Sequence, residues 1–317
     1  MLKKIFISAI LLIAVMSFVV SLLGGKNSVT KSKVPQVQSD KIAVISVDGT
    51  IASGDDQSNI WNETVGASSG TIMRQLRKAA KDDTVKAVLL SINSPGGSVT
   101  AAEEITREIN RFKENSQKPI VATMSDMGAS AAYYIAAPCD KIYVNNSTLT
   151  GSIGVYMSTV NYEELAKKLG VYDVMIKSGP HKDIMSPNRP MTAEERAILQ
   201  NIVNEMYDQF VVTVASGRKM PEDKVRRLAD GRIYTGKQAK ELGLVDEIGD
   251  YYDAVEGTAQ LANISGTPNA VRYNESRTWR NILGAEMTQA LSNKITEQIF
   301  QNLSQETASK QLWAPRS

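Results

Sequence analysis

Short apolar strands alternate with amphipathic helices between residues 41 and 144, and this alternation constrains the fold more than any other feature of the chain. Strand-helix-strand units of this length predict an α/β fold, with a mostly parallel sheet and helices packed over it. Ligands in such sheets bind at the carboxyl ends of the strands. The expected elements are strands at 42–47, 85–92, 119–124 and 141–144, and helices at 71–80 and 99–113.

Ser130 stands where the strand at 119–124 turns into a helix of small residues. Gly128 is expected to supply a flexible turn, and Ala131 and Ala132 allow a sharp bend and close packing. A helix N-terminus favours negative charge, so Ser130 is a candidate nucleophile with an oxyanion forming beside it. Taken alone, however, a serine at this position is more often a simple N-cap.

Two other stretches are candidates to share a site with Ser130. The turn Pro95-Gly96-Gly97 follows a predicted strand, and its glycines can turn backbone N–H groups outward as oxyanion donors, although such a turn alone is common. Gly97 and Ala131 would be the two donors. The second stretch is the loop 177–187, which follows a predicted strand at 174–176 and precedes a helix at 193–217 that opens with a capping box.

The residue counts limit the available chemistry. The chain of 317 residues has one histidine, His181, and one cysteine, Cys139. A site with several imidazoles, a cysteine zinc site and an intrachain disulfide are therefore excluded, and a Ser-His-Asp triad is possible only through His181. Cys139 is expected to be a small buried apolar residue. The formal net charge of +2 gives no indication of nucleic-acid binding.

The N-terminus has the pattern of a membrane anchor. Residues 5–23 carry no charge, and a helix of this length nearly spans a bilayer core. Lysines in residues 1–4 favour a cytoplasmic N-terminus, which places the remaining chain outside the cytoplasm. We therefore expect a single-pass protein of the cell membrane, with an exposed linker at 24–40. A cleaved signal peptide is the alternative, but no clear cleavage site follows the apolar run.

Four blocks of residues together resemble one family, the signal peptide peptidases of the serine/lysine type. These are membrane-anchored relatives of Clp protease and the crotonase fold, built from repeated ββα units. The resemblance covers residues 41–262 and fits the shorter members with a single repeat. The blocks are Ser94-Pro95-Gly96-Gly97-Ser98, Met127-Gly128-Ala129-Ser130-Ala131-Ala132-Tyr133-Tyr134, Thr150-Gly151-Ser152-Ile153-Gly154-Val155, and Lys177-Ser178-Gly179 through Lys182-Asp183.

The resemblance implies a role for each site residue. Ser130 is the nucleophile, Lys182 is the general base, and the backbones of Gly97 and Ala131 form the oxyanion hole. Ser152 corresponds to a serine that hydrogen-bonds the catalytic lysine. No metal or cofactor is implied. The substrates would be apolar peptides, above all remnant signal peptides, and the assembly would be a ring-like homo-oligomer in which adjacent protomers contribute Ser130 and Lys182 to one site.

A lysine base must be neutral to accept a proton. Lowering its pKa from about 10.4 to near 7 costs about 4 kcal/mol and requires an apolar environment. The apolar neighbours Met175, Ile176, Ile184 and Met185 are the expected source of that environment. His181 and, more weakly, Lys177 are alternative bases.

Helix 193–217 carries an apolar stripe at helical spacing, which predicts a core or subunit contact. Residues 263–317 are expected to form a C-terminal helix, with an apolar stripe over 281–303, and a flexible tail. This helix would pack on another subunit or, alternatively, on a membrane surface. Two other functions stay open at this point: crotonase-type acyl-coenzyme A chemistry, and a catalytically silent membrane scaffold of the same fold.

Overall fold

The computed structural model describes residues 40–55 and 66–273. The predicted anchor at 5–23, the linker at 24–39 and the C-terminal helix at 281–303 lie outside the described residues. Among the helices that are described, none is both long and apolar enough to cross a membrane.

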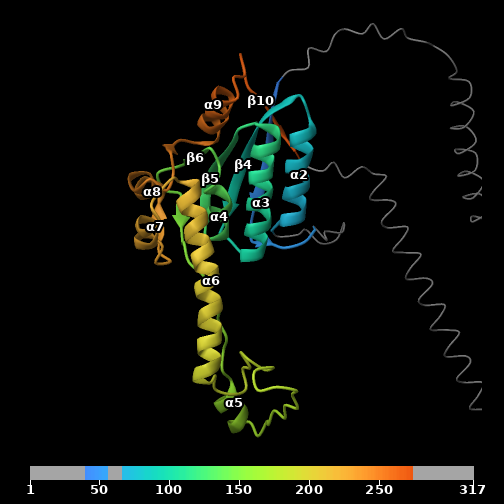
Figure 1. The fold of residues 1–317 in the computed structure, drawn as a ribbon, viewed down its shortest axis with the longest axis vertical. Helices are drawn as coiled ribbons and strands as arrows, with labels where there is room; N and C mark the ends of the chain where they lie inside the picture. The colour runs from blue at the N-terminus through green and yellow to red at the C-terminus, as the bar shows by residue number, and fades with distance from the viewer. Residues whose placement is uncertain (1–39, 56–65, 274–317) are drawn as a thin grey trace, which may run out of the picture. The chain divides into compact units, whose positions relative to one another are not determined.

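A single mostly parallel sheet forms the centre of the fold (Figure 1). Its main path runs in the order β10-β1-β4-β5-β6-β9, and β7 pairs with β5 and, antiparallel, with β8. The other strand pairs are parallel, which confirms the α/β prediction. The strands are β1 (Lys41–Asp48), β4 (Val85–Ser94), β5 (Ile120–Ala129), β6 (Lys141–Val144), β7 (Leu149–Gly151), β8 (Ile233–Thr235), β9 (Glu247–Ile248) and β10 (Asn269–Arg272).

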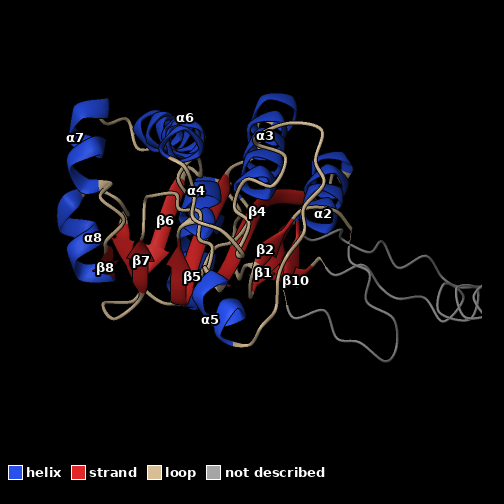
Figure 2. Ribbon diagram, turned by 90° about the horizontal axis from the view of Figure 1, so that it is seen from below, coloured by secondary structure: helices blue, strands red, loops and turns tan. Residues whose placement is uncertain are grey.

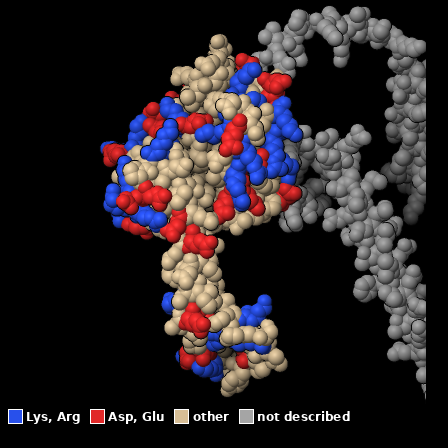
Figure 3. All heavy atoms as spheres, in the orientation of Figure 1, with Lys and Arg blue, Asp and Glu red and all other residues tan. Residues whose placement is uncertain are grey.

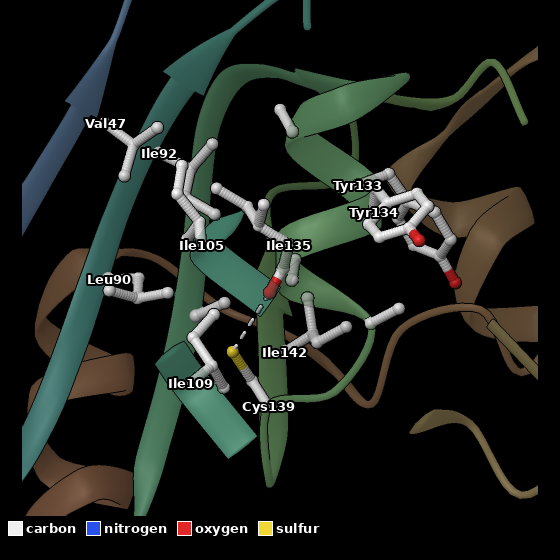
Figure 4. Close-up of a cluster of buried hydrophobic side chains, with 14 of the residues drawn as sticks. Val47, Leu90, Ile92, Ile105, Ile109, Tyr133, Tyr134, Ile135, Cys139 and Ile142 are labelled. Carbon is white, nitrogen blue, oxygen red and sulfur yellow. Dashed lines mark hydrogen bonds between the residues drawn. The ribbon is translucent and has the colours of Figure 1, made fainter. Parts of the chain in front are cut away.

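Helices cover both faces of this sheet. On one face α2 (Ser69–Lys81), α3 (Val99–Ser116) and α4 (Ala131–Ala136) bury the larger core cluster, which Figures 2 and 4 show. On the other face α9 (Tyr251–Leu261) packs Ala254 and Val255 in a smaller cluster with strand residues such as Leu89. Cys139 lies in the larger cluster and is 3% exposed, as the sequence predicts. These layers hold the carboxyl ends of β4 and β5 side by side.

The smaller elements complete this body. A two-stranded parallel sheet joins β2 (Ile51–Ala52) to β3 (Ala67–Ser68). Two short helices, α7 (Glu222–Leu228) and α8 (Gly236–Leu242), accompany β8 and β9.

A long helix, α6 (Ala193–Gly217), leaves the body at one end. In its C-terminal part Phe210, Val211, Val214 and Ala215 are buried, whereas most of residues 193–209 are exposed. Residues 156–192, called the arm here, lie with the short helix α5 (Glu163–Lys168) at the far end of α6 in Figure 1. The apolar stripe predicted on this helix is therefore core only in its C-terminal part: Phe210 and Val214 are buried, but Ile198 and Ile202 are each 36% exposed.

Three expectations need correction. Residues 174–176 are not a strand: they are irregular and exposed, and no strand of the described residues pairs with them. Residues 269–273 do not belong to a C-terminal helix or tail that begins at residue 263, since β10 pairs with β1 and Tyr273 joins the core. Gly128 is not a turn residue; it lies inside β5, where a side chain would collide with Met124.

Candidate functional site

Ser130 itself makes the turn from β5 into α4. Its backbone has φ 54° and ψ −124°, a region that non-glycine residues avoid. Holding a serine there costs about 1–3 kcal/mol and requires the surrounding structure to enforce it. A strained strand-to-helix turn with a serine at its apex is the geometry of a nucleophile elbow.

The side chain of Ser130 does not cap the helix that it precedes. Ser98 and Thr192 occupy the same position before α3 and α6, and each accepts a hydrogen bond from a backbone N–H of its helix. Ser130 makes no such bond, and its hydroxyl has no hydrogen-bond partner among the residues that the structure describes. The interpretation of Ser130 as an ordinary N-cap is therefore wrong.

The turn at Gly96 and Gly97 lies directly against Ser130. The register of β4 and β5 shifts between Ile92 and Ser94, and at the carboxyl ends of these strands Ser94 lies opposite Gly128. A Cβ atom added to Gly96 would lie 2.7 Å from the Cβ of Ser130 and 2.9 Å from the backbone nitrogen of Ala131. Only glycine fits this approach, and the φ of 103° also favours glycine.

Gly97 fits an equally narrow space on the other side of the turn. Its added Cβ would lie 2.1 Å from the carbonyl oxygen of Ile51, because β2 runs beside the turn. The Ile51 N–H donates to the Gly96 carbonyl, and the Ser98 N–H donates to the Ile51 carbonyl. These bonds leave the N–H of Gly97 without a hydrogen-bond partner in residues 40–55 and 66–273, and Gly97 is exposed.

Ala131 offers a second free donor. It is the first residue of α4, so its N–H has no partner inside the helix, and it makes no other bond to the described part of the chain. The N-terminal end of a helix also carries partial positive charge. Gly97 and Ala131 are therefore two unpaired backbone donors on the two turns that meet at Ser130.

A third segment meets Ser130 from β7. The Ser130 N–H donates to the Gly151 carbonyl over 2.8 Å, and the hydroxyl of Thr150 donates to the Gly128 carbonyl over 2.7 Å. Ser152 follows Gly151, has φ 50°, and donates its N–H to the Arg232 carbonyl. The structure thus brings Ser130, Gly97, Ala131 and Ser152 to one edge of the sheet.

Lys182 is not at this edge. It lies in the arm, at the far end of α6, and it is exposed. No hydrogen bond joins Lys182 to Ser130, and its amine has no ion-pair partner in the part of the chain that the structure describes. Of the four apolar residues expected to surround Lys182, Met175 is 53% and Ile176 is 95% exposed, whereas Ile184 and Met185 are partly buried.

The basic side chains near Lys182 in the sequence lie beside acidic groups. The amine of Lys177 lies 2.6 Å from Asp183, and Arg189 contacts both Asp183 and Glu195. Arg189, together with Lys177, holds the pKa of the Asp183 carboxyl well below its usual value. His181 lies 3.6 Å from Glu194. Lys182 therefore differs from its basic neighbours in having an amine without a partner.

Sequence reasoning selected the turn that contains Gly96 but missed the role of Gly96 itself, whose lack of a side chain makes room for Ser130. The signal was the glycine pair itself, since two adjacent glycines after a buried strand indicate backbone contact on both sides of a turn. The described residues contain no group of three or more His, Cys, Asp or Glu side chains placed to hold a metal ion. Acidic and basic side chains are interspersed on the face in Figure 3, without an extended field of one sign.

Two family models match parts of the chain. Residues 112–265 match peptidase family S49, and residues 43–172 match the N-terminal domain of NfeD1b. The chain is 46% identical to a putative protease of Methanocaldococcus jannaschii over 193 residues, which is 61% of each chain.

Two bacterial relatives are matched more completely. A putative signal peptide peptidase SppA of Enterococcus faecium is 42% identical over 73% of this chain and 67% of its own length. A putative protease of Synechocystis is 42% identical over 71% of this chain and 75% of its own length. The chain belongs to peptidase family S49.

Proposed function

We propose that this chain is a membrane-anchored serine peptidase that hydrolyses apolar peptides, with remnant signal peptides as its main substrates. The observation that carries the proposal is the strained, uncapped Ser130 with two unpaired N–H donors beside it. Membership of a peptidase family favours this reaction over acyl-coenzyme A chemistry, and a silent scaffold would have no use for the strain at Ser130. The apolar run at 5–23 supports the anchor, which would hold the site near peptides left in the bilayer.

In the proposed reaction, the neutral amine of Lys182 takes the proton from the Ser130 hydroxyl as its oxygen attacks the peptide carbonyl. The N–H groups of Gly97 and Ala131 stabilise the oxyanion. The lysine ammonium then protonates the departing amine, which leaves an acyl group on Ser130. A water molecule activated by the same lysine releases the acyl group. Ser152, beside Ser130, would orient the amine of the lysine.

We further propose that the lysine comes from a neighbouring copy of the chain. Lys182 is exposed, unpaired and carried away from its own Ser130 by α6. The arm also exposes apolar side chains that a neighbouring subunit would cover, and their burial would supply the dry environment that a neutral lysine needs. Those more than half exposed include Tyr156, Val160, Leu169, Tyr172, Val174 and Ile176.

Subunit mixing tests this proposal. Full-length Ser130→Ala and Lys182→Ala proteins should each lose peptide hydrolysis, and only the Lys182→Ala chain should keep the serine that fluorophosphonates label. In co-assembled complexes, random mixing should restore about a quarter of the wild-type activity, because one site in four then combines an intact serine with an intact lysine. A proven mixed assembly with no recovery would contradict sharing of the site between copies. Full activity of Lys182→Ala would contradict the base itself.

A further inference from the structure

We infer that Tyr134 is a positioning residue that sets the angle of the arm relative to the nucleophile. The inference rests on the proposed function, in which α6 must present Lys182 to a site in another copy. Tyr134 contacts both the backbone of Ser130 and the point where α6 leaves the body.

The contact with Ser130 is a backbone hydrogen bond. The N–H of Tyr134 donates to the carbonyl oxygen of Ser130 over 2.9 Å, closing the first turn of α4. Tyr134 is 5% exposed and lies at one end of the core cluster in Figure 4. The residue therefore cannot shift without disturbing the turn that holds the nucleophile.

The contact with α6 involves both the ring and the hydroxyl of Tyr134. The ring centroid lies 4.8 Å from that of Phe210, the first residue of α6 after Glu195 to be fully buried. One turn further along α6, the Thr213 hydroxyl donates to the Tyr134 hydroxyl over 3.0 Å. Tyr134 of α4 thus contacts α6 at the point where α6 enters the body.

Few other contacts hold α6 on the side that faces α3. A hollow of about 570 Å³ between α3 and α6 is bordered by Tyr134, Thr213 and Val212, so α3 does not pack against α6 there. On the other side, Arg226 of α7 pairs with Asp208, but both side chains are about half exposed, and such pairs stabilise little. Val211 and Val214 of α6 and Val225 of α7 are also buried in the larger core cluster, so Tyr134 is the buried contact of α6 on the side of α4.

Geometry makes the contact important for catalysis. Residues 193–209 form a helical lever about 25 Å long at 1.5 Å per residue, so a tilt of about 10° at Phe210 moves the arm by about 4 Å. A base must lie within about 3.2 Å of the proton that it removes. A small tilt at Tyr134 would therefore remove Lys182 from reach.

Spin-label distances measure the tilt directly. Lys168 of α5 and Glu114 of α3 are both exposed and can be replaced by cysteine for labelling. The native Cys139 is buried and, since burial raises the pKa of its thiol to about 12, it will not react. Double-labelled full-length chains, diluted with unlabelled chains to suppress distances between copies, report the arm-to-body distance within one chain.

Tyr134→Phe, Thr213→Val and Phe210→Leu should each shift or broaden this distance and lower kcat by about 3–10-fold, with KM nearly unchanged. The double variant Tyr134→Phe with Thr213→Val should be no worse than either single variant, because both remove the same hydrogen bond. Tyr133→Phe is the matched control. It removes a buried hydroxyl from the same helix, one that donates to the Leu244 carbonyl and not to a residue of α6.

Unchanged distances in the Tyr134→Phe and Phe210→Leu proteins would overturn the inference, and so would an equal distance change in Tyr133→Phe. The distance readout does not depend on the identity of the base. If Lys182→Ala were fully active while Tyr134→Phe still moved the arm, the proposed function would fail and the positioning role would survive without its link to catalysis.

Discussion

Ser130, the turn at Gly96 and Gly97, and the residues 150–152 form one region, called the corner here. The corner and the arm around Lys182 are opposites in physical character. At the corner, three chain segments meet through buried strands, backbone hydrogen bonds and glycines that admit no side chain. The arm has one short helix, α5, without a buried residue, and most of its large apolar side chains are exposed. The nucleophile and its donors are preorganised within one chain, whereas the proposed base is presented outward.

This difference indicates what positions the functional groups in each half of the site. The strain at Ser130 persists because its surroundings permit no alternative conformation. The arm has internal order, from ion pairs of Arg189 and from hydrogen bonds such as that of the Tyr162 N–H to the Pro187 carbonyl. Most of its large apolar side chains nevertheless stay exposed. We expect changes in the corner to act within each chain and changes in the arm to act through assembly.

The largest effect should come from Gly96→Ala. The new Cβ would collide with Ser130, at a φ of 103° that disfavours alanine. We expect kcat/KM to fall about 100-fold or more and the free energy of unfolding to fall by about 1–3 kcal/mol. Peptide hydrolysis and thermal unfolding measure the two effects.

Gly179→Ala is the matched change in the arm. A Cβ at Gly179 would meet no atom within 4 Å, so activity and stability should stay near wild type. An active Gly96→Ala protein would show that the structure around Ser130 can accommodate a side chain at residue 96. The proposed contrast between the corner and the arm would then be wrong.

A smaller effect is expected from Arg189→Ala. Arg189 links Asp183 of the arm to Glu195 of α6, and with the Thr192 N–H it lowers the pKa of Glu195 to about 2. Its loss should speed amide hydrogen exchange across 180–195 and reduce activity about 10-fold through misplacement of Lys182. Arg226→Ala is the control. It breaks an exposed ion pair between α7 and Asp208 of α6, and it should have little effect.

The same link predicts a pH dependence. Since the pKa of Glu195 is lower in the folded arm than its unfolded value of about 4.3, its stabilising contribution is complete above that pH. The contribution is lost as the pH falls from about 4.3 toward 2. Exchange in the arm, corrected for intrinsic rates, should rise over this interval in the wild type and respond less in Arg189→Ala. An identical response in both proteins would remove Arg189 from this role.

The smallest effect is expected from His181→Gln. His181 lies beside Glu194 and Glu195 in the arm, and a glutamine keeps a polar side chain there. We expect kcat/KM within about 2-fold of wild type and an unchanged pH profile, since a true general base contributes about 100-fold or more. A loss of that size would make His181 the base in place of Lys182.

The sequence by itself determined much of the body and the position of the nucleophile. Apolar runs such as 85–92 and 141–144 became strands, and Thr192 with Glu195 formed the expected capping box. These features depend on residues close together in the chain, so local patterns are sufficient to predict them. Ser130 and the Gly96-Gly97 turn could be chosen for the same reason, because each directly follows a buried strand.

Only the tertiary structure decided which of these residues meet. The register of β4, β5 and β7 places Gly96 and Gly151 against Ser130, and Ser130, with its positive φ, makes the turn that Gly128 was expected to supply. The predicted strand at 174–176 is wrong because a strand needs a partner, and residues 40–55 and 66–273 provide none for it. The separation of Lys182 from Ser130 depends on the direction of α6, which is set where Phe210 and Thr213 pack on Tyr134. Local patterns describe single elements, whereas the distance between two functional groups depends on packing between elements that are remote in the sequence.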